Sequence, residues 1–90
     1  MHITAAELAS ATGITTTNAD RILAHFDDAN TAALRLSALI TDLTATDEQI
    51  TAAVNVRAAD LATARTVARD LGLPDGDIER LALNARTGAL

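Results

Sequence analysis

The sequence contains no cysteine, tryptophan, tyrosine or lysine, and Phe26 is its only aromatic residue. Without cysteine, neither a disulfide nor a thiolate metal site can stabilise the chain. Any core has to be built from aliphatic side chains and from alanine, which makes up 21 of the 90 residues. Because alanine favours helix but buries little apolar area, we expect a thin core that self-association or a partner supplements.

Basic residues are also scarce. Seven arginines stand against twelve acidic residues, and the net charge is −5. Such a chain lacks the broad positive field that supplies most nucleic-acid affinity, although it remains compatible with a narrow arginine-bearing face. No apolar run reaches the roughly 20 residues that span a bilayer, and no signal peptide pattern is visible at the N-terminus. We therefore expect no membrane partner and a location in the cytoplasm, or in a virus particle assembled there.

Glycine and proline are confined to the two ends of the chain, and neither occurs between Gly13 and Gly72. Long alanine-rich stretches without these residues indicate helix, and no alternating strand pattern competes with them. We predict an all-α fold in which residues 1–90 form a single domain. Its architecture is expected to be a compact bundle of about four helices, in the order short, long, long, short.

The first helix has a clear start and end. Thr4 and Glu7 have the spacing of a capping box, in which each side chain bonds the backbone amide of the other residue. Gly13 is the expected C-cap. One of the threonines at 15–17 is expected to cap the second helix, which continues an apolar face. That face consists of Ala19, Ile22, Leu23, Phe26, Ala29, Ala33, Leu36, Ile40 and Leu43. Polar residues at 27–31 compete for backbone hydrogen bonds, which leaves open whether residues 18–44 form one helix or two.

The third helix begins at a second capping box, formed by Thr46 and Gln49. Its apolar residues are alternately four and three apart, a coiled-coil-like spacing that Arg57 interrupts. These positions are Ile50, Val54, Arg57, Leu61, Ala64, Ala68 and Leu71. Gly72 and Pro74 predict its end.

A short fourth helix is predicted to follow, with Asp75 or Asp77 as its N-cap. Its buried face is expected to contain Ile78, Leu81, Ala82 and Ala85. Residues 86–90 are expected to fray.

The chain offers little for catalysis. Its hydroxyl nucleophile candidates are Ser10, Ser37 and the threonines, and none of them lies in a glycine-flanked elbow. Ser37, His25 and an aspartate could be combined into a Ser–His–Asp set, but any chain of this composition contains such residues, so the set does not indicate catalysis. His25 and Asp28 fall short of the three or four ligands that a metal site needs. We therefore predict no enzyme, no metal, no cofactor and no small-molecule substrate.

The stretch 5–22 resembles a helix-turn-helix. Ala9 in the first helix lets two helices cross closely, Gly13 turns the chain, and Ile22 packs the second helix on the first. The resemblance implies a DNA-binding transcriptional regulator whose second helix enters the major groove. The residues that face the groove and the phosphates are then Thr15, Thr16, Thr17, Asn18 and Arg21.

Residues 3–14, I-T-A-A-E-L-A-S-A-T-G-I, resemble the start of the small helical head–tail connector (adaptor) proteins of tailed phages. In that family a short helix and a glycine turn precede a long helix similar to residues 20–43. A further helix, similar to residues 49–71, and a short C-terminal one follow. The resemblance implies a compact helical bundle that assembles as a ring beneath the portal. The chain departs from the family by being short and by lacking the usual aromatic residues of the third helix.

Three function hypotheses follow. The first is a non-catalytic helical module for protein–protein interaction and self-association, most specifically a phage connector that acts in virion assembly. Its interaction surface is predicted to combine Arg57, Arg65 and Arg69 with exposed apolar residues of the second helix. The alternative is the helix-turn-helix regulator, which binds nucleic acid. The third is a small helical inhibitor or antitoxin-like protein that binds a host protein.

Overall fold

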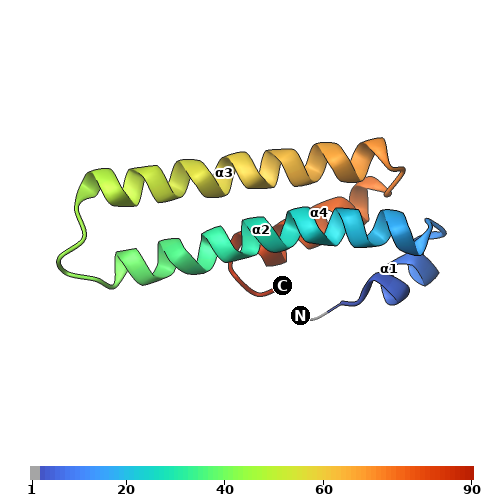
Figure 1. The fold of residues 1–90 in the computed structure, drawn as a ribbon, viewed down its shortest axis with the longest axis horizontal. Coiled ribbons are helices and arrows are strands. Elements are labelled where there is room, and N and C mark those ends of the chain that lie inside the picture. Colours follow the sequence, from blue (N-terminus) through green and yellow to red (C-terminus); the bar gives the residue numbers. More distant parts are fainter. Residues whose placement is uncertain (1–2) are drawn as a thin grey trace.

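The computed structural model describes residues 3–90 as four helices joined by short loops (Figure 1). Helix α1 spans Ala5–Thr12, α2 spans Thr16–Ile40, α3 spans Asp47–Asp70 and α4 spans Asp75–Arg86. The predicted all-α bundle of about four helices, with two long helices between two short ones, is confirmed. No helix in this part of the chain is both long and apolar enough to cross a membrane.

Helix α1 begins and ends where its capping residues predict. The Thr4 hydroxyl accepts the Glu7 backbone N–H at 3.2 Å, and Gly13 ends the helix with φ 80°. The reciprocal half of the predicted capping box is wrong. The Thr4 hydroxyl donates to Glu7 Oε1 at 3.0 Å, so the carboxylate bonds the hydroxyl of Thr4 instead of its amide.

Helix α2 is one continuous helix across the polar residues 27–31. Thr15 caps it by accepting the Asn18 backbone N–H at 3.1 Å. The helix ends at Ile40, so Leu43, which was predicted to continue its apolar face, lies in the loop before α3.

Helix α3 begins with the predicted capping box. The Thr46 hydroxyl accepts the Gln49 N–H at 3.1 Å, and Gln49 Oε1 accepts the Thr46 N–H at 2.8 Å. Pro74 occupies the N-cap of α4 and makes no side-chain capping bond, so the prediction of an aspartate cap is wrong. Asp75 and Asp77 lie in the first turn of α4, where their negative charge interacts favourably with the helix dipole.

The prediction that residues 86–90 fray is wrong. The Leu90 N–H donates to Asn30 Oδ1 at 3.0 Å, and the Ala89 N–H donates to the Asn84 carbonyl at 2.8 Å. The Leu90 side chain packs against the core. The tail therefore returns to the middle of α2.

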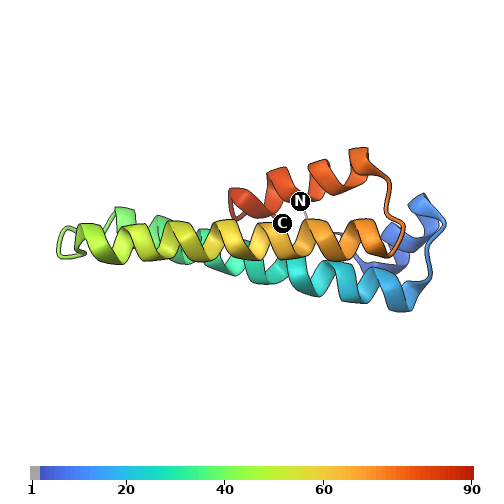
Figure 2. The same cartoon turned by 90° about the horizontal axis from the view of Figure 1, so that it is seen from above.

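The core lies at one end of the molecule. Helices α2 and α3 form a long antiparallel hairpin, and α1 and α4 cover only the half of it that is far from the α2–α3 loop (Figure 2). The largest fully buried side chains are Phe26, Ile22 and Ile78, and much of the remaining core is alanine. The predicted thin core is thus observed, together with the predicted buried face of α4.

The hairpin gives the chain an elongated shape of 46 × 21 × 19 Å. Its radius of gyration is 14.0 Å, against about 12 Å for a compact chain of this length. The accessible surface is 5358 Å², against about 5,000 Å² for a typical monomer of 9.3 kDa. We call residues 37–56, which extend beyond the cover of α1 and α4, the distal hairpin.

Candidate protein interface

The distal hairpin exposes the same sides of α2 and α3 that form the core in the half of the hairpin covered by α1 and α4. Ile40 follows the buried Leu36 by one helical turn but is 61% exposed. Val54 precedes the buried Leu61 by two turns and is 38% exposed. Because residues four or seven apart share one side of a helix, the apolar faces of α2 and α3 continue past the end of their cover.

Leu43, in the loop, adds to this surface and is fully exposed. Leu34 and Val56 are about half exposed, but Val56 lies on the opposite side of α3 from Val54, and Leu34 lies against Gly88. Ile40, Leu43 and Val54, which the sequence places on apolar helix faces, therefore lie outside the core. Periodicity identified their helix sides correctly, but it carries no information about where the covering helices end. The sequence predicts exposed apolar residues of the second helix in the interaction surface, but it does not identify Leu43 or Val54 as exposed.

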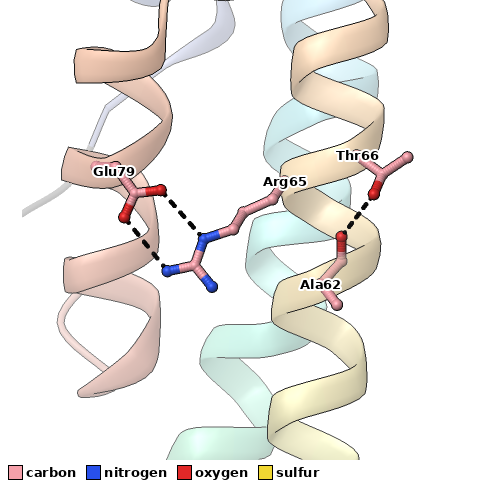
Figure 3. Close-up of polar contacts among 4 residues, drawn as sticks. All are labelled: Ala62, Arg65, Thr66 and Glu79. Carbon is pink, nitrogen blue, oxygen red and sulfur yellow. Dashed lines mark hydrogen bonds and ion pairs between the residues drawn. The ribbon is translucent and has the colours of Figure 1, made fainter.

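Two arginines of α3, Arg57 and Arg65, contact α4. Arg65 Nε lies 3.3 Å from Oε1 of Glu79, and a second guanidinium nitrogen donates to Oε2 at 3.4 Å (Figure 3). The buried Nε makes no aligned hydrogen bond, so this first contact is electrostatic. Both side chains are partly exposed, and such pairs contribute about 0.2–1 kcal/mol.

Arg57 lies near the C-terminal end of α4. Its guanidinium donates to the Arg86 carbonyl at 3.4 Å, which satisfies one of the free carbonyls at that helix end. Arg57, Arg65 and Arg86 line an open pocket of about 310 Å³ together with Val54, Ala58 and Leu61. The pocket adjoins the distal hairpin, so positive charge borders its apolar surface.

The partner-binding role predicted for the arginines remains a prediction. Arg57 and Arg65 make contacts with α4. Arg69 is exposed in the last turn of α3, where its positive charge interacts favourably with the helix dipole. The structure thus brings two of the three residues together in the pocket beside α4 and leaves Arg69 outside it.

The helix-turn-helix-like residues lie at the start of α2. Thr16, Thr17 and Arg21 are exposed, but the hydroxyl of Thr15 is occupied in capping the helix and Asn18 is half-buried. Three aspartates, at positions 20, 27 and 28, are also exposed on the first half of the helix. Arg21 is the only basic residue among them, so this surface is unfavourable for an approaching phosphate.

The residues considered for catalysis or metal binding do not form a site. Ser37 and His25 lie on the same continuous helix, twelve residues and therefore about 18 Å apart along its axis. Among residues 3–90, no three His, Cys, Asp or Glu side chains are placed to hold a metal ion. A second pocket of about 310 Å³ lies beside α2, where Ile3 and Leu90 approach it; its lining among residues 3–90 includes Asp20 and Asp27.

Comparison with known families, curated proteins and solved structures gave no match to this chain.

Proposed function

We propose that this protein is a non-catalytic helical module for protein–protein assembly, most specifically a connector of the phage head–tail type. The observation that carries the proposal is the distal hairpin, whose apolar faces continue from the core into solvent. Exposing Ile40 and Leu43 is unfavourable, because each large aliphatic side chain gains about 1.5–3 kcal/mol when it is removed from water. Exposed apolar residues that continue a buried helix face are typical of a protein interaction site.

The test is co-purification of tagged protein from cells of its source. The double variant Ile40→Ser/Leu43→Ser removes apolar surface at exposed positions, so its fold should be unaffected. Leu83→Ser is the matched control, because Leu83 is 63% exposed but lies on α4. We expect wild type and Leu83→Ser to retain the same stoichiometric partners and the double variant to lose them. Capsid or portal proteins among these partners support the connector form, and partners that all three proteins retain equally contradict the proposal.

A DNA-binding regulator remains the second candidate, because α1, the turn at Gly13 and α2 have the helix-turn-helix element order. Retention on duplex DNA along a salt gradient separates the two functions. A regulator is retained at low salt and released with a steep salt slope, which Arg21→Ala should reduce. An assembly module with a net charge of −5 is expected to flow through. The inhibitor or antitoxin-like function predicts instead a single host protein partner in the co-purification.

A further inference from the structure

The apolar surface of the distal hairpin lies between charges of opposite sign. Asp47 is in the first turn of α3, beside the loop, and Arg57 is ten residues later, where α4 ends. Asp47, Val54 and Ala58 lie seven and eleven residues apart along α3 and therefore share one side of the helix. Val54 and Ala58 line the pocket that contains Arg57. The acid, the apolar residues and the arginine thus follow one another along a single surface.

Arg57 retains unused donors. Its guanidinium has five N–H groups and makes one hydrogen bond, to the Arg86 carbonyl. Within residues 3–90, neither Arg57 nor Arg86 has a carboxylate within 4.0 Å; Arg65 is the arginine that has one, from Glu79. In a chain of net charge −5, these two arginines form an uncompensated positive site at the base of the distal hairpin.

We propose that the occupant of this surface is the distal hairpin of a second copy of the chain, packed antiparallel about a two-fold axis. Asp47 and Arg57 are separated by ten residues, or about 15 Å of helix. An axis passing near residue 52 places Asp47 of each copy beside Arg57 of the other. Ile40, at the end of α2, and Val54 of the two copies then face one another, whereas Leu43, in the loop before Asp47, lies beyond Arg57 of the other copy. Such an isologous contact closes as a dimer, and its two α2 and two α3 segments form a four-helix bundle.

The available area fits a reversible dimer. From Asp47 to Arg57, α3 is about 15 Å long, and two packed helices are about 20 Å wide. Two such faces cover roughly 600 Å² in total, which is below the roughly 1,200 Å² of a stable specific interface. We therefore expect weak, reversible dimerisation that is detected only at high protein concentration.

This inference rests on the proposed function, since it names the partner of the same surface. Its test uses the purified full chain alone. Sedimentation velocity over a concentration series should show the mass rise from 9.3 kDa to twice that value. Ile40→Ser/Leu43→Ser should remain monomeric at every concentration, and Leu83→Ser should dimerise like the wild type. A wild-type chain that stays monomeric into the millimolar range overturns the proposal.

A charge exchange tests the antiparallel register. Arg57→Glu alone places acid against acid at both ends of the contact, and Asp47→Arg alone places arginine against arginine, so each variant should weaken dimerisation at least tenfold. An equimolar mixture should recover it, because in the mixed dimer each end again pairs opposite charges. Helical circular dichroism checks that both variants are folded. If the two variants dimerise as well alone as in the mixture, or if the mass grows beyond two chains, the two-fold arrangement is wrong.

The two proposals fail in distinguishable ways. A monomeric purified chain whose co-purifying partners still depend on Ile40 and Leu43 overturns the dimer but supports the assembly function. A dimer that depends on Ile40 and Leu43, with co-purifying partners that do not, supports the dimer and overturns the proposed role of this surface in capturing other proteins.

Discussion

Asn30, in the middle of α2, accepts at its Oδ1 the backbone N–H of Leu90 at 3.0 Å, across sixty residues of chain. Asn30 is the only buried polar residue among residues 3–90. This bond fixes the C-terminal residues against α2, beyond the end of α4, and it explains why they do not fray.

Replacing Asn30 with alanine should therefore destabilise the protein by about 1–2 kcal/mol, because the partly buried amide of Leu90 loses its acceptor. We expect hydrogen exchange of the Leu90 amide to become fast. Amides in the middle of α3 should lose only the protection that corresponds to the change in the free energy of global unfolding. Urea denaturation measures the free energy of unfolding. Asn55→Ala, at an exposed position of α3, is the control and should change stability by less than about 0.5 kcal/mol. Equal effects of the two substitutions would contradict the role of this bond.

Gly88 makes the turn that brings the tail back to Asn30, and we predict that it is less replaceable than Gly13. Both have positive φ, 75° and 80°, so alanine at either position costs about 1–2 kcal/mol of backbone strain. A Cβ at Gly13 meets open space, whereas at Gly88 it lies 2.7 Å from Leu34 Cδ2. Gly88→Ala should thus be the more destabilising in urea denaturation. Adding Leu34→Ala to it should recover the difference, and a strictly additive double variant would exclude the steric contact.

Local signals predicted most of the helix boundaries. Thr4, Gly13 and Thr46 act through atoms at most four residues away, so their effect can be read from spacing alone. The bond between Leu90 and Asn30 has no such signal, because it joins residues that only the tertiary fold brings together. The pairing of Arg65 with Glu79 depends in the same way on how α4 lies on α3.

The candidate interface was only half predictable for a related reason. The period of Leu36 and Ile40, or of Val54 and Leu61, identifies which side of a helix is apolar. Whether that side is buried depends on the length of the covering helices. Helix α4 has 12 residues and α3 has 24, so part of the apolar side of α3 is left without cover. Sequence periodicity alone does not show how much of this side is covered.

Phe26 is expected to dominate the stability of the alanine-rich core. It is fully buried and is the largest such side chain. Phe26→Ala should cost about 3–5 kcal/mol, a large part of the roughly 5–13 kcal/mol typical of a chain this long. Phe26→Leu, which keeps most of the volume, should cost about 1.5 kcal/mol or less. Thermal unfolding followed by circular dichroism measures both. If Phe26→Ala melts with the wild type, the core does not depend on this ring.

The loop between α2 and α3 should be sensitive to acid through Asp42. Its Oδ1 accepts the Thr44 backbone N–H at 2.9 Å and the Thr44 hydroxyl at 2.8 Å, and these bonds lower the pKa of Asp42 below its usual value of 3.8. A carboxyl with a depressed pKa stabilises the folded loop fully above its ordinary pKa, and this contribution is lost as the pH falls through the lower folded value. The Thr44 amide resonance should therefore titrate with a midpoint below pH 3.8. In Asp42→Asn, whose side chain still offers an acceptor but does not ionise, that titration should disappear. A Thr44 midpoint at or above 3.8 in the wild type would show that the two bonds do not hold the carboxylate in solution.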